Sequence, residues 1–533
     1  MKKEHILRSH INRRDFIKYG LATGAVGFMA SQMAFVQAQG GGTMVWLGHQ
    51  EIAGLSPNDY GPTVQAVVIY NIHNPLLHTD YQIQTVPVLA ESYEVSDDGL
   101  TYTFKLREGV MFHDGSELTS ADVKYTYDYY RAEENATNLV QEFTNVGSVD
   151  TPDDYTVVVN MDAVNAAFLT TGATVPIVNA KHHAELGEDL YRTDPIGTGA
   201  FKLKEWRAAE FTELEAFDDH FRGRPGVDIL RMEVVPEPSV RHIAMLTGDA
   251  DSSVWPLLVE DSLSYEGDPN YRVLRTLSRS VKHIILNNNI PALSDKVVRQ
   301  AMLHALDRQR IIDDLWNGTA VVAHSHLTPA NTYYHKEDVK QYDFDPEAAN
   351  AMLDEAGYVM GSDGVREKDG VRLSFTCTTI TGDSARRPIA ELAQLLFKDI
   401  GVDMQLAEAP LSTIFEGLKT NEVEASLFNW TYGRNPEPDS AYILQTGAGR
   451  NFNNYSNPEV DELLIEGVSI VDPEARREIY HRIQDIIAEE VPFLPLQYDQ
   501  TLTVFSAAIE GMPEEIIWVD AAYYFAHEWS KNG

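Results

Sequence analysis

A two-residue alternation of apolar and polar positions is clearest between residues 100 and 106. Leu100, Tyr102, Phe104 and Leu106 are apolar or aromatic, whereas the residues between them are polar. This period predicts a strand with one buried face. Residues 91–95 precede it across the turn sequence Ser-Asp-Asp-Gly at 96–99, so the two segments are expected to form a β-hairpin.

Helices are predicted where a capping residue precedes apolar positions three and four residues apart. Thr119 and Asp122 have the spacing of a capping box and precede a tyrosine-rich segment, which we interpret as a helix packed on the core. Ser294 precedes a strongly periodic segment. We expect it to cap one amphipathic helix that runs to about Trp316.

Two further helix starts are marked by an aspartate followed by a proline. Asp345 and Asp472 can cap helices whose first position is that proline, and Gly357 is placed to end the first of them. Strand-like segments alternate with the helices at residues 43–48, 155–160, 200–206, 211–216, 230–235, 372–378 and 425–429. This alternation predicts an α/β fold.

The first 38 residues have the features of an export signal. Basic residues cluster there, and a weakly apolar run from Leu21 to Val36 follows, too short for a permanent membrane anchor. The string from Asn12 to Lys18 resembles a twin-arginine signal, with an ordinary Sec signal as the alternative. We therefore expect a periplasmic protein whose signal peptide, residues 1–38, is cleaved near Ala38.

Charge and cysteine content narrow the classes of partner. The formal net charge is −38, from 80 acidic and 42 basic residues, which argues against a nucleic-acid partner. Cys377 is the only cysteine, so an intrachain disulfide is excluded, and no cysteine near the cleavage point can carry a lipid. We expect a monomer whose fold depends on its apolar cores.

Catalytic motifs are absent from the sequence. It contains no Gly-Lys pair of a P-loop, no H-E-x-x-H and no G-x-S-x-G. The chain is therefore expected to be neither an enzyme nor a carrier of a cofactor. A secreted hydrolase is the least favoured alternative.

A longer pattern covers nearly all of the chain after residue 38. Residues 89–110 (LAESYEVSDDGLTYTFKLREGV) and 112–115 (FHDG), followed by Leu118-Thr119 and Asp122-Val123, resemble the signature of a family of ABC-transporter proteins. That family is the peptide/nickel-type extracellular solute-binding proteins, family 5 or dipeptide-binding-like. Further matching blocks follow in family order at residues 195–201, 248–251, 298–301, 305–308, 430 and 457–461.

The resemblance implies a periplasmic binding protein-like α/β fold with two lobes and a hinge, in the large class with an extra inserted domain. By analogy, the first lobe takes residues 39–73, 194–276 and 500–533, the inserted domain residues 74–193, and the second lobe residues 277–499. The strands that cross between the lobes would form the hinge. The implied function is capture of a peptide or peptide-like solute by lobe closure and delivery to an inner-membrane ABC permease.

The resemblance also implies where the ligand binds. The family's pocket lies between the lobes and includes the stretch after Trp430, where dipeptide binders place an ammonium-binding aspartate about three residues on. Gly433 and Arg434 stand there instead, and a guanidinium favours a ligand with an anionic end. Alternatively, Arg434 pairs with Glu437 or Asp439, or Asp439 replaces the missing aspartate. The candidate ligand-binding residues are Trp430, Tyr432, Gly433, Arg434, Asn435, Asp439, Trp255, Trp46, His49 and Glu51.

Other ligand classes stay open. An anionic end would suit an opine or a modified sugar, and the nickel-binding branch of the family suggests a metal or metal-chelate carrier. The pairs His182-His183 and His324-Ser325-His326 encourage a metal, but they lie in different segments, and no metal ligand is predicted. A ligand-dependent chemoreceptor partner would use the same closure.

Overall fold

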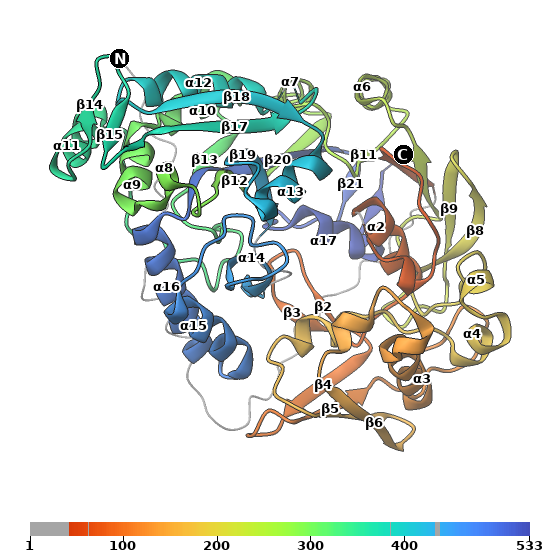
Figure 1. The fold of residues 1–533 in the computed structure, drawn as a ribbon. Helices are drawn as coiled ribbons and strands as arrows, with labels where there is room; N and C mark the ends of the chain where they lie inside the picture. Colours follow the sequence, from red (N-terminus) through yellow and green to blue (C-terminus); the bar gives the residue numbers. More distant parts are fainter. Residues whose placement is uncertain (1–41, 62, 384, 432–436, 533) are drawn as a thin grey trace, which may run out of the picture. The chain divides into compact units, whose positions relative to one another are not determined.

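An eleven-stranded mixed sheet runs through the computed structural model, which describes residues 42–61, 63–383, 385–431 and 437–532. The predicted signal peptide lies outside these residues. Along the sheet (Figure 1) the strand order is β18 (Asp403–Ala409), β17 (Ser374–Ile380), β19 (Ala425–Thr431), β12 (Tyr271–Leu286), β20 (Phe493–Ser506), β11 (Ser252–Ser253), β1 (Thr43–Gly48), β10 (Ile229–Val234), β9 (Phe211–Ala216) and β8 (Phe201–Arg207), with β13 (Ala320–Val322) paired to β20.

Two long strands connect the two halves of this sheet. β12 has 16 residues and β20 has 14, and they pair antiparallel from Tyr271 opposite Ser506 to Ile285 opposite Phe493. The register shifts between Leu277, opposite Gln500, and Val281, opposite Tyr498. Residues 278–280 therefore form a β-bulge, which bends a strand and redirects its side chains. The bulge lies at the two predicted lobe boundaries, 276/277 and 499/500.

A separate four-stranded antiparallel sheet contains the predicted hairpin. Its order is β4 (Ala90–Val95), β5 (Thr101–Leu106), β7 (Thr156–Met161) and β6 (Val146–Asp153). The prediction for the hairpin is confirmed, because β4 pairs with β5 and the side chains of Tyr102, Phe104 and Leu106 are buried. Shorter strands form the pairs β2 (Leu77–Thr79) with β3 (Thr85–Pro87) and β21 (Ile509–Glu510) with β22 (Ser530–Lys531), and the three-stranded sheet β14 (Val359–Met360), β15 (Arg366–Lys368), β16 (Val371–Arg372).

The predicted caps at Thr119, Asp345 and Asp472 are confirmed. The Thr119 backbone N–H donates to the Asp122 carboxylate at 2.9 Å, before α3 (Ser120–Arg131). The side chains of Asp345 and Asp472 each accept a backbone N–H at 2.8 Å in the first turns of α11 (Pro346–Glu355) and α16 (Pro473–Glu490).

The single helix predicted from Ser294 to Trp316 is wrong. Ser294 is instead the last residue of α8 (Pro291–Ser294), and the segment after it forms two helices, α9 (Lys296–Ala305) and α10 (Arg308–Leu315). Asp295, not Ser294, caps α9 by accepting the Val297 N–H, and Asp307 caps α10. Aspartate side chains readily accept backbone N–H groups at helix starts. They therefore break the helix here, although the apolar period continues across the break.

The other helices complete the layers around the sheets. They are α2 (Thr63–Ile72), α4 (Ala180–Leu186), α5 (Glu188–Tyr191), α6 (Pro238–Thr247), α7 (Val259–Leu263), α12 (Arg387–Lys398), α13 (Leu411–Thr420), α14 (Ala441–Leu444), α15 (Pro458–Ser469) and α17 (Val519–Tyr524). Short 3₁₀ turns are η1 (Pro57–Asp59), η2 (Glu133–Asn135), η3 (Val140–Phe143), η4 (Phe168–Thr170), η5 (Gly172–Thr174) and η6 (Ala526–Glu528).

Separate apolar cores lie in three parts of the chain. One joins residues of 44–72, 200–274 and 505–529, the second lies within 76–191, and the third spans 284–496. A further cluster, within 281–498, packs on α15 and α16. Each core can stabilise its own body by apolar burial. The division into lobes at the stated boundaries stays a prediction.

The hairpin turn contacts the predicted second lobe. A Cβ built on Gly99, whose φ is +68°, would lie 2.6 Å from Cγ2 of Val471, and Val164 lies beside the same glycine. Nearby, the Ala166 backbone N–H donates to the Val468 carbonyl at 3.2 Å. We call this the hairpin contact. It joins Ala166 to the last turn of α15 and Gly99 to Val471, between α15 and α16, so a side chain at position 99 would disturb it.

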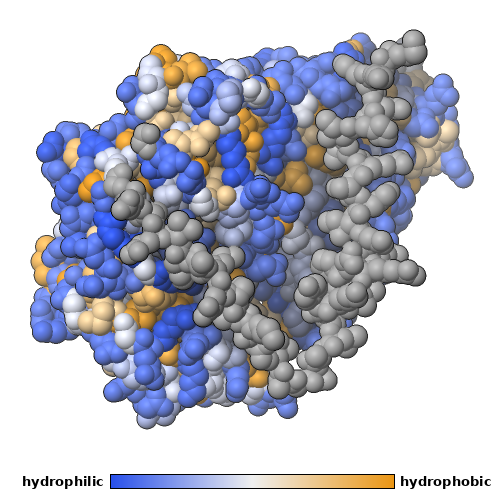
Figure 2. All heavy atoms as spheres, turned by 180° about the vertical axis from the view of Figure 1, so that it is seen from behind, coloured by the Kyte–Doolittle hydropathy of each residue, from blue (hydrophilic) through white to orange (hydrophobic). Residues whose placement is uncertain are grey.

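The surface of the described residues is largely hydrophilic on the face in Figure 2, with apolar side chains in scattered patches. On α6, Val240, Ile243 and Leu246 are each about half exposed. Over the described ranges, none of the helices combines the length and the hydropathy that crossing a membrane requires.

Cys377 is expected to be unreactive in the native protein. It lies fully buried in β17, and burial raises the pKa of its thiol to about 12. Because this pKa lies well above the ordinary value of 9.0 for a cysteine, about a thousandfold less of the thiol is present as thiolate, the reactive form. A maleimide at pH 7.5 should therefore label the protein only after urea unfolds it. Native labelling at the rate of a free thiol would show that β17 opens in solution.

Candidate ligand-binding site

A cavity of about 370 Å³ opens between segments far apart in the sequence. Small-molecule sites commonly measure about 300–1,000 Å³, so its size suits a small solute. Tyr60 and Gly61 follow η1 and Tyr70 lies in α2, whereas Arg279 lies in the bulge of β12 and Thr431 at the end of β19. The remaining lining residues are Asn138, Leu139, Glu142, Thr170, Thr171, Thr174, Val175 and Pro176, from the η3 to η5 region.

The β-bulge places Arg279 at this cavity. Two extra residues on β12 interrupt the ladder with β20, and Ser280 pairs with Thr431 on β19 beside them. The guanidinium carbon of Arg279 lies 4.6 Å from the ring centre of Trp518, a cation–π distance. The charge of Arg279 also acts on the half-buried Asp520, whose pKa is raised by desolvation and lowered in turn by Arg279.

Hydroxyl groups and aromatic rings form much of the remaining wall. Thr170, Thr171 and Thr174 lie in two consecutive 3₁₀ turns, so their side chains are presented on one short segment. Tyr60 and Tyr70 lie with ring centres 5.8 Å apart, nearly perpendicular. Such a lining offers hydrogen bonds together with apolar area, which suits a solute that has polar groups at fixed positions.

Trp430 lies next to the cavity wall and packs into an aromatic cluster. It is half-buried in β19, with its ring centre 5.8 Å from those of Phe415 and Phe452, both stacked, and 5.2 Å from Phe428. Its neighbour Thr431 lines the cavity. The structure thus places the predicted tryptophan where it positions the end of β19, and its contact with ligand stays a prediction.

Four of the predicted residues, Tyr432, Gly433, Arg434 and Asn435, lie outside the described residues. The charged residues that follow them are described. Glu437 is buried and forms a bidentate ion pair with Arg476 of α16, with one contact of 3.2 Å between Arg476 Nη1 and Glu437 Oε1. Asp439 is half-buried and accepts the Ala441 backbone N–H at 2.9 Å, at the start of α14. The anionic-end hypothesis at Arg434 therefore stays a prediction.

The predicted residues near the first strand divide into two groups. Trp46 is 1% exposed and packs edge-on against Tyr523 and Trp529, so it lies in a core rather than at the cavity. His49 and Trp255 are brought together, with ring centres 4.2 Å apart, and Trp255 is 43% exposed.

Burial and the nearby charge of Arg241 lower the pKa of His49. Glu51 is exposed on the loop after β1. As ligand contacts, Trp46, His49, Glu51 and Trp255 stay predictions.

Most of the chain matches a known protein family. Residues 84–453 match the family model "Bacterial extracellular solute-binding proteins, family 5 Middle". The chain belongs to this family. The resemblance stated from the sequence is thereby confirmed, and so is the α/β fold of periplasmic binding proteins.

Relatives with known structures or names cover nearly the whole chain. The oligopeptide-binding protein AppA of Bacillus subtilis (strain 168) is 31% identical over 452 residues, 83% of each chain. Its structure in complex with a nonapeptide has a TM-score of 0.72 and covers 93% of this chain and 100% of that one.

Other family members differ in the ligands their names state. The glutathione-binding protein GsiB of Escherichia coli (strain K12) is 27% identical over 477 residues, 86% of this chain and 89% of that one. NikZ from Campylobacter jejuni in complex with Ni(L-His) is 26% identical, with a TM-score of 0.75, and covers 92% of this chain and 99% of that one.

The histidines considered as metal ligands in this family 5 protein have other neighbours. His183 is 1% exposed, hydrogen-bonded to the Tyr125 hydroxyl at 2.9 Å and to Glu188 at 3.0 Å. His182 faces the Asp194 carbonyl at 2.9 Å. Within the described ranges, no three His, Cys, Asp or Glu side chains gather as a metal site would require.

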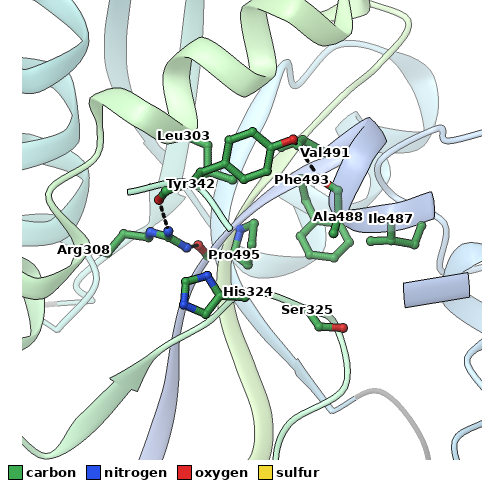
Figure 3. A pocket seen from close by; sticks show the side chains of 10 residues that line it. All are labelled: Leu303, Arg308, His324, Ser325, Tyr342, Ile487, Ala488, Val491, Phe493 and Pro495. Atoms are coloured by element: carbon green, nitrogen blue, oxygen red, sulfur yellow. Dashed lines mark hydrogen bonds between the residues drawn. The ribbon is translucent and has the colours of Figure 1, made fainter. Parts of the chain in front are cut away.

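His324 belongs to a second, much smaller cavity of about 10 Å³, which has room for a single water at most (Figure 3). Beside it, Arg308 donates to the carbonyls of Ala323, Tyr342 and Pro495. Burial lowers the pKa of Arg308 to about 10. Residues 305–308, which match the family, thus include Asp307, which caps α10, and Arg308, which hydrogen-bonds to three separate segments.

Sequence reasoning missed Arg279 and Glu142. The run Leu277-Ser278-Arg279-Ser280-Val281 places three polar residues inside an apolar strand, and this signal could have revealed the bulge. Glu142 follows no strand or helix pattern, because it lies in a 3₁₀ turn that only the surrounding packing orders.

Proposed function

We propose that this family 5 protein is the solute-binding component of an ABC importer and captures a peptide or peptide-like solute in the 370 Å³ cavity. One observation carries the proposal: the cavity is lined jointly by residues of the predicted first lobe, inserted domain, hinge and second lobe. A solute that contacts all of them is satisfied only when they come together, so its binding free energy favours closure.

The lining favours a peptide-like ligand. Peptide units of a ligand can hydrogen-bond to the threonine hydroxyls, to the Asn138 amide and to backbone groups of the lining. Recognition through the ligand's main chain tolerates many different ligand side chains. AppA and GsiB, whose names state an oligopeptide and glutathione, are relatives of matching length. A metal ligand is less favoured, since the cavity lining contains no histidine or cysteine among the described residues.

The paired strands at the bulge are the proposed hinge. On its second-lobe side, Lys282 is buried, with Nζ 3.4 Å from the ring centre of Trp316 and 3.2 Å from the Asp499 carboxylate. These contacts fix one side of the bulge, whereas residues 278–280 have no register partner on β20. Bending can therefore concentrate at residues 278–280.

Export and assembly form part of the same proposal. The basic, weakly apolar N-terminus and the twin-arginine-like string support export to the periplasm with cleavage near Ala38. We propose that the mature protein works as a monomer, delivers its solute to an inner-membrane permease and catalyses no reaction on it.

Release of the native ligand tests this function. The purified protein, produced without a His tag, is denatured, and the released molecules are identified by mass spectrometry. We expect a peptide-like compound, and addition of that compound to the empty protein should reduce its radius of gyration in X-ray scattering. Stoichiometric nickel would contradict the peptide assignment, and a scattering profile unchanged by the bound compound would contradict closure.

A further inference from the structure

A histidine of the predicted inserted domain binds a buried segment of the predicted first lobe. The His113 backbone N–H donates to the Gly197 carbonyl at 2.9 Å. Its ring makes two further bonds to the same segment: Nε2 lies 2.9 Å from the Gly199 carbonyl oxygen, and the Gly197 backbone N–H donates to Nδ1 at 3.3 Å. We call these three hydrogen bonds the histidine joint.

The segment that the joint holds is packed closely against the end of α2. A Cβ built on Gly197 would overlap the Ile72 carbonyl oxygen and would lie 2.7 Å from Nδ1 of His73. The Gly199 backbone N–H donates to the same Ile72 carbonyl at 2.8 Å. The segment therefore has no room to shift toward α2, and His113 contacts it from the inserted domain.

The two backbone partners determine the protonation state of the His113 ring. A carbonyl oxygen only accepts and a backbone N–H only donates, so Nε2 carries the hydrogen and Nδ1 carries none. The neutral ring in this tautomer satisfies both bonds. Protonation of Nδ1 would place a ring N–H against the Gly197 N–H, so one hydrogen bond would be replaced by a repulsive contact of two donors.

The surroundings of His113 also favour the neutral ring. Its charged and titratable neighbours come from four segments: Asp114 beside it, His73 after α2, Lys202 of β8, which pairs with Glu215 of β9, and His220 after β9. Desolvation lowers the pKa of His113 to about 4, and the charge of Lys202 acts in the same direction, whereas the Gly199 carbonyl and Asp114 raise that pKa.

The sign of the pH dependence follows from this lowered pKa. When the joint opens, the ring returns to its ordinary pKa of 6.5, so the open form binds a proton more readily than the closed form. The closed joint is therefore stable above pH 6.5 and loses stability as the pH falls toward about 4.

We propose that the histidine joint is a proton-sensitive connection between the inserted domain and the first lobe, held closed by the neutral His113 ring and released in acid. The inserted domain supplies Thr170, Thr171 and Thr174 to the cavity, so the joint determines how firmly that wall is held. The proposal goes beyond the proposed function, because the joint exists whatever solute the cavity takes.

Hydrogen exchange of the mature chain tests the joint without any ligand. Amide exchange in peptides that cover residues 195–201 is followed by mass spectrometry at about pH 7.5 and about pH 5, and each rate is corrected for intrinsic exchange at that pH. The opening ratio is the opening equilibrium constant at the lower pH divided by that at the higher pH. A histidine whose pKa rises from about 4 to 6.5 on opening contributes a factor of about thirty to this ratio.

The variant His113→Gln separates proton sensitivity from a merely structural role. Glutamine keeps an N–H donor and an acceptor but binds no proton in this range, so its opening ratio should be about thirtyfold smaller than that of the wild type. A structural role alone would change the opening equally at both pH values. His113→Asn serves if the glutamine variant does not fold. His304→Gln, on α9 in the predicted second lobe, is the control and should leave the ratio unchanged.

Two results would overturn the proposal. An opening ratio near one in the wild type would mean that the joint keeps its bonds in acid. Equal ratios in the wild type and in the His113 variant would mean that another group, such as His73 or His220, binds the proton. Solute binding plays no part in these measurements, so either result would leave the proposed function intact.

Discussion

Replacement of Arg476 by methionine is expected to lower the free energy of unfolding by about 3–5 kcal/mol, because it leaves the Glu437 carboxylate buried without its counter-charge. Both side chains of the pair are less than 10% exposed. Burial by itself lowers the pKa of Arg476, but the facing Glu437 carboxylate outweighs it and raises that pKa. Arg476 also donates from Nε to the Gly467 carbonyl at 2.9 Å.

Urea unfolding followed by circular dichroism measures this loss, with Arg482→Met as the control. Arg482 lies on the same helix α16 but is 54% exposed and pairs with Glu459 at the surface, so its loss should cost less than about 1 kcal/mol. The double variant Glu437→Met with Arg476→Met removes both charges and should recover much of the stability. Equal costs for Arg476→Met and Arg482→Met would contradict the importance of the buried pair.

Arg308→Met is expected to cost roughly 3 kcal/mol, because three carbonyls lose a charged donor in a buried place. Those carbonyls belong to the turn at Ala323, the segment at Tyr342 and strand β20 at Pro495. In Figure 3 the guanidinium points toward Tyr342 and Pro495 from the start of its helix. Thermal and urea unfolding provide the measurement.

The matched control for Arg308 is Arg310→Met, two residues later in α10. Arg310 is 53% exposed and pairs with Asp314 across one helical turn, an arrangement worth a few tenths of a kcal/mol. Arg308→Lys should recover only part of the loss, since one ammonium cannot reach three carbonyls in different directions. An Arg308 variant as stable as the Arg310 variant would show that water replaces the guanidinium at little cost.

Local sequence signals predicted the elements that local chemistry determines. The hairpin at 90–106 and the caps at Asp345 and Asp472 depend on residues only a few positions apart, and all of them are confirmed. The break at Asp307 was missed because the apolar stripe continues through it, and the stripe reports burial rather than helix continuity.

The candidate site was less accessible to prediction because distant segments build it. Trp46 lies in a strand, β1, as its sequence context predicts. The sequence does not show, however, that its side chain packs against Tyr523 near the C-terminus. Arg279 lies at the cavity where the register of β12 with β20 shifts, next to Ser280, the residue at which pairing of β12 with β19 begins. Such registers depend on tertiary packing, which no local period encodes.

The hairpin contact has a consequence for how selectively the importer is loaded. Gly99 and Ala166 contact Val471 and the last turn of α15, and neither belongs to the cavity lining. A contact of this kind, which needs no ligand, raises the fraction of ligand-free molecules that are already closed. The apparent dissociation constant for the solute falls in proportion to that fraction. A larger closed fraction also means that more ligand-free molecules present the closed conformation to the permease. A stronger contact at this turn would therefore raise the affinity for the solute but also increase unproductive binding of empty protein to the permease.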